Sequence, residues 1–168
     1  QVLGTLQLAG TGQLDVLNSV FVDNTLTLDV GASLNIVNQF RIDGTVTNNG
    51  DLTIVNAGAL VTSVGIYTNN GTSTIAGGLS TGTYLNLGTT TLAGNMLGEI
   101  TNDGVWQVTG AANATSFKQN TLGSLVLDRT FSTNQNAQVE GSVEFVWRTN
   151  GNDSGRFSVG GVASIGLN

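Results

Sequence analysis

The 168-residue sequence contains no cysteine, no histidine and no proline. Without cysteine, the chain has neither a disulfide framework nor a cysteine-based zinc site. Without histidine, it lacks the side chain that most often binds metals and that acts as a general base near neutral pH. These absences exclude the commonest metal centres and the commonest catalytic base, while the lack of cysteine does not indicate a compartment.

Charged residues are also scarce, at 10% of the chain, and the net charge is −6. The five Lys and Arg residues are scattered, so the sequence offers no basic patch for a nucleic acid. Hydrophobic residues make up only 39%, so the surface must consist largely of Asn, Thr, Ser, Gln and Gly. This composition is typical of secreted bacterial or archaeal surface proteins, and we expect an extracellular or cell-surface location. Gln1 suits a mature N-terminus left by removal of a signal peptide, and no apolar run approaches the roughly 18 residues of a membrane span.

A repeated unit of two short strands and a turn organises the chain, most clearly over residues 45–59 (TVTNNGDLTIVNAGA). Copies of its turn tetrad stand at 47–50 (TNNG), 68–71 (TNNG) and 101–104 (TNDG). Copies of the strand that follows the turn stand at 14–18 (LDVLN), 34–38 (LNIVN) and 52–56 (LTIVN). The interval between the tetrads that begin at 68 and 101 is longer than the others, which predicts a longer turn with an inserted loop. A period of roughly 20 residues built from short strands is typical of a β-solenoid.

Apolar and polar residues alternate in short segments bounded by Gly or Asn, which is the pattern of half-buried strands. We therefore predict an all-β fold, a β-solenoid (parallel β-helix) with coils of about 20 residues, in a single domain over residues 1–168. Regular repeats are expected at 1–110, and more irregular coils and closing strands at 111–168. Residues 111–119 suit a helical turn or a loop. A sandwich or a stack of hairpins is the alternative, because Asn-Gly also marks hairpin turns.

Stacked coils bring equivalent residues on top of one another, about 4.8 Å apart. Trp106 is expected at the position that Leu52 holds in its own repeat. We expect Asn side chains at the turns to hydrogen-bond along the axis as a ladder, and Asn and Gly to supply the positive φ angles of tight corners. The residues expected to point into the core are Leu14, Leu34, Leu52 and Ile54, with Val16 and Ile36 beside them. The asparagines expected in the ladder are those of the TNNG turns together with Asn18, Asn38 and Asn56.

No constellation of residues suits catalysis. The eleven acidic residues are spread along the chain, whereas sugar-cleaving enzymes on β-helices need clustered carboxylates. Asp43 and Asp51 flank the first TNNG turn and fit solvated turn residues better than a catalytic pair. The chain has no G-x-S-x-G elbow and no phosphate-binding loop. We therefore predict no enzyme activity, no catalytic residue, no cofactor and no metal site.

Two repeats, 44–58 (GTVTNNGDLTIVNAG) and 65–78 (GIYTNNGTSTIAGG), resemble those of large secreted bacterial repeat proteins, including filamentous-haemagglutinin-like proteins and autotransporter passenger solenoids. The segment 142–167 resembles a closing module of such proteins, in which a strand and a polar loop precede a V-x-G-x-A-x-[IL] pattern, matched here at 159–165. The resemblance implies a β-solenoid with an adhesive, structural or display role at a cell surface. It supplies no catalytic residues.

The end strands suggest self-association. Residues 2–8 and 159–167 both alternate apolar residues, and neither end shows a helix, a proline or a charged cluster that would cap an exposed strand edge. We therefore predict a structural extracellular subunit of a filament, sheath or adhesin stalk, which joins other copies of itself head to tail. The residues predicted for the subunit contact are Val2, Leu3, Leu6, Leu8, Val159, Ile165 and Leu167.

Two alternative functions and one modification stay open. The chain also fits an adhesive module of a longer surface protein, whose further coils would cover the same ends and which would contact carbohydrate or a cell surface. Ranks of T-x-T at 25–27, 45–47 and 89–91 fit binding to ice or another crystal surface. Asn70, Asn113 and Asn152 match the N-glycosylation sequon, which matters in an archaeal or eukaryotic secretory route.

Overall fold

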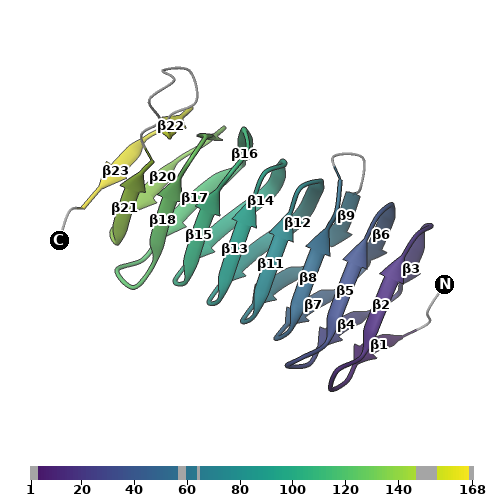
Figure 1. Ribbon diagram of the computed structural model, residues 1–168. Helices are drawn as coiled ribbons and strands as arrows, with labels where there is room; N and C mark the ends of the chain where they lie inside the picture. The colour runs from purple at the N-terminus through teal and green to yellow at the C-terminus, as the bar shows by residue number, and fades with distance from the viewer. Residues whose placement is uncertain (1–3, 57–59, 64, 147–154, 167–168) are drawn as a thin grey trace.

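The computed structural model describes residues 4–56, 60–63, 65–146 and 155–166, and within these ranges it contains short β-strands and no helix. The strands wind around one axis through about seven turns. The first and last strands lie at opposite ends of this elongated solenoid (Figure 1). Neighbouring strands in the described part pair in parallel, whereas hairpins would make them antiparallel. The predicted all-β solenoid is therefore confirmed, and the sandwich and hairpin stack are excluded.

Each coil contributes one strand segment to each of three faces. The first face contains β1 (Thr5–Leu8), β4 (Thr25–Leu28), β7 (Thr45–Asn48), β10 (Ile66–Asn69), the second halves of β12 (Gly78–Asn86) and β14 (Met96–Asn102), β17 (Ser116–Gln119), β20 (Ala137–Val139) and β23 (Ala163–Ile165). The second face contains β2 (Gln13–Val16), β5 (Ser33–Ile36), β8 (Asp51–Ile54), β11 (Thr72–Ile75), β13 (Thr89–Leu92), β15 (Val105–Val108), β18 (Ser124–Leu127) and β21 (Ser142–Phe145). The third face contains β3 (Val20–Val22), β6 (Gln39–Ile42), β9 (Leu60–Ser63), the first halves of β12 and β14, β16 (Ala112–Ala114), β19 (Thr130–Thr133) and β22 (Arg156–Val159).

Coil length varies along the axis. Thr5 pairs with Thr25 and Thr25 with Thr45, so the first coils keep the expected period of about 20 residues. Further along, the coils are shorter, since Asn69 pairs with Asn86 and Asn86 with Asn102, at sequence separations of 17 and then 16. The loop predicted between the tetrads at 68 and 101 is therefore wrong. This interval holds a complete extra coil, whose turn reads Leu-Asn-Leu-Gly at 85–88 and so escapes a search for Thr-Asn-Asn-Gly.

Residues 111–119 form strands, and the expectation of a helical turn or loop there is wrong. β16 and β17 occupy this stretch. Ala112, Ala114, Phe117 and Gln119 are buried, whereas Asn113 and Lys118 are exposed. The small alanines hide the alternation from a sequence reading, because Ala has no strong preference for strands.

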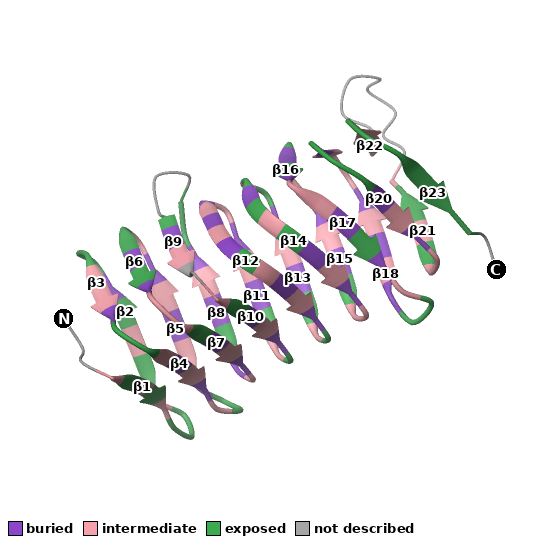
Figure 2. Ribbon diagram, turned by 180° about the vertical axis from the view of Figure 1, so that it is seen from behind, coloured by how far each residue is buried: buried purple, intermediate pink, exposed green. Residues whose placement is uncertain are grey.

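The core is a set of axial files, each made of inward-facing residues from successive coils. Leu14, Leu34 and Leu52 share one file of the second face, and Ser73, Thr90 and then Trp106 continue it. The predicted core residues Leu14, Leu34 and Leu52 therefore face inward. Val16, Ile36 and Ile54, which were also predicted, face inward in the next file. Leu14 is only partly buried because no described coil covers it on its outer side. Buried residues alternate with partly buried or exposed ones along the strands of the middle coils (Figure 2).

The glycines of the TNNG turns are required by close packing between coils. A Cβ atom on Gly71 would lie 2.2 Å from the carbonyl oxygen of Gly50, and one on Gly88 would lie 2.1 Å from that of Gly71. Neither distance leaves room for a methyl group. Positive φ angles in the described residues occur only at Gly4, Gly10, Gly31 and Gly98. Glycine therefore supplies the predicted positive φ at the corners that contain Gly10 and Gly31, whereas the prediction is wrong for the TNNG corners and for asparagine.

The first asparagine of each TNNG turn points into the core and forms a buried ladder. The Nδ2 atom of Asn48 donates to Oδ1 of Asn69 at 2.8 Å, Asn69 donates in the same way to Asn86 at 2.8 Å, and Asn86 to Asn102 at 2.7 Å. Asn102 continues the ladder by donating to Oε1 of Gln119 at 3.2 Å. The predicted ladder is confirmed for these residues, and because it is buried, each amide depends on it for its hydrogen bonds.

The other asparagines behave differently. Asn70, the second asparagine of its turn, donates to Asn49 at 2.8 Å on the exposed surface. Asn56 donates to the carbonyl oxygen of Val37 at 3.2 Å, which is a bond to backbone and not to another asparagine. Asn18 and Asn38 are exposed. The ladder thus has two parts. The buried rail consists of Asn48, Asn69, Asn86, Asn102 and Gln119 and contains most of the hydrogen bonds, and the exposed rail consists of Asn49 and Asn70.

Two buried tyrosines are tied to this ladder. The rings of Tyr67 and Tyr84 stack with centroids 4.7 Å apart. The hydroxyl of Tyr84 lies 2.9 Å from Oγ1 of Thr90, which in turn donates to Oδ1 of Asn86 at 2.9 Å. Burial raises the pKa of Tyr84 to about 12 and raises the pKa of Tyr67 well above its usual value of 10.0.

We expect this burial to make the protein sensitive to alkali. The unfolded chain titrates its tyrosines near pH 10, so their contribution to stability is complete below that pH and is lost as pH rises through the higher folded pKa. The free energy of unfolding should fall by about 1.4 kcal/mol per pH unit for each tyrosine between pH 10 and 12. Urea titrations of the wild type and of the Tyr67→Phe/Tyr84→Phe variant at pH 8 to 12 check this. An equally steep fall in the variant would contradict it.

Candidate assembly interface

Among the described residues, no group of three or more acidic side chains lies close enough together to hold a metal ion. No helix long and apolar enough to span a membrane occurs in the described part of the chain. The surface hollows and the two ends of the solenoid are the features that could bind a partner.

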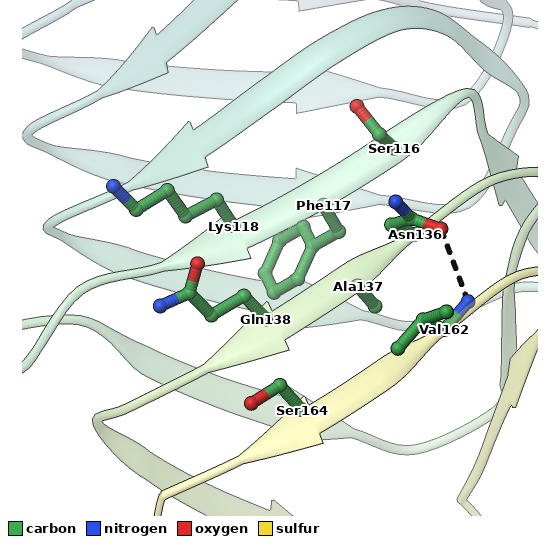
Figure 3. Close-up of a pocket in the computed structure, with 8 residues that line it drawn as sticks. All are labelled: Ser116, Phe117, Lys118, Asn136, Ala137, Gln138, Val162 and Ser164. Carbon is green, nitrogen blue, oxygen red and sulfur yellow. Dashed lines mark hydrogen bonds between the residues drawn. The ribbon is translucent and has the colours of Figure 1, made fainter.

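A shallow recess of about 330 Å³ lies on the first face, where β17, β20 and β23 run side by side (Figure 3). Lys118 and Gln138 stand on its outer surface, while Phe117 points into the core. Oδ1 of Asn136 accepts a hydrogen bond from the backbone N–H of Val162 at 3.0 Å. Its lining includes one cationic side chain and no carboxylate, so it offers no acid–base pair. Binding of a carbohydrate stays a prediction.

A second hollow of about 280 Å³ opens at the C-terminal end of the solenoid. It lies where the core files run out, because β21, β22 and β23 pair on one side only within the described chain. These three strands contain no fully buried residue (Figure 2). Phe145 is 56% exposed and Ile165 is 59% exposed, although both continue files whose previous members are buried. The lining is wholly apolar: Val139, Val143, Phe145, Phe157 and Ile165.

The N-terminal end of the solenoid also presents strand edges and an apolar surface. β1, β2 and β3 each pair with a strand on one side only among the described residues. Their inward side chains are apolar, and four of the six are only partly buried, whereas Val16 and Val22 are buried. The partly buried residues packed against the core at this end are Leu6, Leu8, Leu14 and Val20. Each end thus combines a row of backbone N–H and C=O groups at a sheet edge with an apolar core surface, the combination by which an edge strand takes up another strand.

The predicted contact residues are distributed between these two ends. Leu6 and Leu8 lie on β1, Val159 on β22 and Ile165 on β23, and all four occupy inward positions of the end coils. Val2, Leu3 and Leu167 lie outside the described residues. The sequence reading missed the larger apolar side chains of the C-terminal end, Val143, Phe145 and Phe157. Their alternation was visible in the sequence, but their place at the end depends on which strand is last in each sheet.

The threonine ranks lie on two different faces. Thr25 and Thr27 on β4 stack in register with Thr45 and Thr47 on β7, on the first face. The rank at 89–91 lies on β13 of the second face and stacks on the one at 72–74. The ranks therefore do not form one continuous array, and ice or crystal-surface binding stays a prediction.

Comparison of the chain with protein-family models, with curated proteins and with solved structures finds no match. The solenoid architecture thus stands on the structure alone, and the resemblance to a specific class of secreted surface repeats stays a prediction. Of the predicted glycosylation residues, Asn70 and Asn113 are exposed, and Asn152 lies outside the described residues.

Proposed function

We propose that this β-solenoid is a structural module that lengthens by end-to-end association, the N-terminal coil of one copy covering the C-terminal coil of another. The observation that carries the proposal is the apolar hollow at the C-terminal end, bordered by strands that pair on one side only in the described chain. The opposite end presents edges and partly buried leucines of the same kind. The two surfaces differ, so the contact is heterologous and repeats along the axis into a filament.

Both favourable contributions to the free energy of a strand-addition contact, main-chain hydrogen bonds and apolar burial, are available at these ends. Added strands form main-chain hydrogen bonds, each contributing about 0.5 to 1.5 kcal/mol net. Covering the half-exposed apolar side chains contributes about 25 cal/mol for each Å² of apolar surface removed from water. Three strands add at once, and their sum must exceed the several kcal/mol lost when two free molecules become one.

The setting that we propose is extracellular, with the module serving a fibre, sheath or adhesin stalk. The support for this is compositional: a sparsely charged chain rich in Asn and Thr, and without cysteine. An adhesive module of a longer surface protein would use the same ends to continue its own coils. The two roles share one mechanism, which is the growth of a solenoid by adding coils at a strand edge.

We expect the variant Phe145→Asp to assemble far less readily than the wild type. Phe145 is 56% exposed in the free chain, so a charge there is solvated in the monomer but would be buried in the junction. Loss of one buried Phe corresponds to a critical concentration at least tenfold higher. Negative-stain microscopy and sedimentation over a range of concentrations measure this.

Leu87→Asp is the matched control, because Leu87 is 48% exposed at a corner of the middle coils, where the next coil already has an aspartate, Asp103, at the equivalent position. It should assemble like the wild type. A wild-type chain that stays monomeric at every concentration would contradict the proposed function. Filaments of Phe145→Asp at the wild-type concentration would show that the C-terminal end is not the contact.

A further inference from the structure

The geometry of the two ends decides how one copy would sit on the next, if copies associate end to end as proposed above. Among the described residues, the first face contains nine strands along its path, from β1 to β23, whereas the second face contains eight, from β2 to β21. β23 pairs on β20 and begins a new coil, so it lies one strand further along the axis than β21 and β22. The C-terminal end of the described chain is therefore a step, with β23 as the raised part.

A copy stacked without rotation does not fit this step. Its β1 would pair with β23, and its β2 and β3 would then lie one strand position too far from β21 and β22. The gap would be one strand wide, about 4.8 Å, and would leave the apolar hollow uncovered. The edges of β21 and β22 would also keep unpaired N–H and C=O groups in a nearly closed space.

We propose that the second copy docks turned by one face about the axis, so that its β1 pairs with β21, its β2 with β22 and its β3 with β23. All three sheets then continue without a gap. The lengths match strand by strand: β1 and β21 have four residues each, β2 and β22 have four each, and β3 and β23 have three each.

The inward side chains match in this arrangement. Each strand end presents two inward positions, identified by the buried residues with which they share a file. The facing pairs, with the residue of the second copy first, are Leu6 on Val143, Leu8 on Phe145, Leu14 on Phe157, Val16 on Val159, Val20 on Ala163 and Val22 on Ile165. All twelve are apolar, so the core files run through the junction and the hollow is filled.

The outward charges favour the turned arrangement. Gln7 of the second copy faces Glu144, which pairs an amide donor with a carboxylate. Asp15 faces Ser158 and lies diagonal to Arg156, within reach of that long side chain. Without the turn, Asp15 and Glu144 instead lie in the same outward file of the second face, separated by the one-strand gap, and their like charges repel each other. Asp15, Glu144 and Arg156 are all exposed in the single chain.

Charge reversal distinguishes the two arrangements. In the turned junction, Asp15→Arg sets two cations side by side and should raise the critical concentration for assembly roughly two- to tenfold at low salt. Arg156→Asp should do the same, and the double variant Asp15→Arg/Arg156→Asp should recover the wild-type value. In the unturned junction, the arginine of Asp15→Arg lies in the same file as Glu144 and attracts it across the gap, so this variant would instead assemble more readily.

Cross-linking supplies a second measurement, because the natural chain has no cysteine. The variant Gln7→Cys/Glu144→Cys places both thiols directly opposite each other in the turned junction, while within one copy they lie at opposite ends. A short bismaleimide should then convert assembled protein into covalent oligomers on a denaturing gel. The control Asp15→Cys/Glu144→Cys should remain largely monomeric.

Three outcomes would overturn the turned arrangement while leaving the proposed function standing. They are efficient linkage of the control, easier assembly of Asp15→Arg, and no change in either single charge variant. A wild type without filaments would overturn both.

Discussion

The variant Ile54→Asp should fail to fold over the coils around β8. Ile54 is fully buried, and its neighbours along the file, Ile36 and Ile75, are apolar. An aspartate there finds no hydrogen-bond donor in its file, so it must be buried as an unpaired charge or take up a proton at a large cost. We expect a loss of more than about 4 kcal/mol in the free energy of unfolding. Circular dichroism and urea unfolding measure it.

The matched control is Thr53→Asp, one residue earlier on the same strand. Thr53 points outward between Asn35 and Thr74 and is only partly buried. A carboxylate there stays in contact with water, so the expected change is within about 1 kcal/mol. Equal stability of Ile54→Asp and the wild type would mean that the inward file is not packed as described.

The variant Asn86→Leu should be the second most damaging change, although it replaces a polar residue by an apolar one inside the core. Asn86 donates to Oδ1 of Asn102 and to the carbonyl oxygen of Val105, and it accepts from Nδ2 of Asn69 and Oγ1 of Thr90. Leucine has a similar shape but offers none of these bonds. Each buried group left without a partner costs about 1 to 3 kcal/mol, so we expect a loss of about 3 to 5 kcal/mol in urea unfolding.

Asn70→Leu is the control for this prediction. Asn70 is exposed and bonds to Asn49 on the surface, and the next coil already carries a leucine, Leu87, at the equivalent position. The change should alter stability by less than about 1 kcal/mol. If Asn70→Leu and Asn86→Leu were equally stable, the buried rail of the ladder would contribute no more than the exposed one.

The ladder also couples the middle coils to one another. Leu28 precedes Asn48 in the same file, and Val139 follows Gln119, so the polar rail is confined to the middle coils and is closed by an apolar residue at each side. Within it, each amide donates to the coil after it, and every amide except that of Asn48 also accepts from the coil before it. The middle coils are thus coupled more tightly than apolar contacts alone would couple them.

Much of the fold was predictable because a solenoid repeats one environment at each coil. Leu34 and Leu52 meet the same neighbours, so they recur at a regular interval, and the period of the sequence is the period of the structure. The same reasoning identified the inward files, the all-β class and the asparagine ladder of the TNNG turns, although it did not separate the buried first asparagine from the exposed second one. It also identified both ends as apolar strands, although the side chains of Val143, Phe145 and Phe157 were not assigned to the contact.

The sequence by itself determined the repeat, the inward faces of the strands and the residue types stacked along the axis. Only the tertiary structure decided which coil each strand belongs to. The coil around Asn86 was hidden because its turn keeps the buried Asn and the close-packed Gly and changes the other two residues, which do not face the core. One cause placed the threonines of β4 and β13 on different faces and made β23 the raised strand of the C-terminal end. A strand's face and level depend on the summed lengths of all the corners before it, and exposed corners can gain or lose residues at little energetic cost.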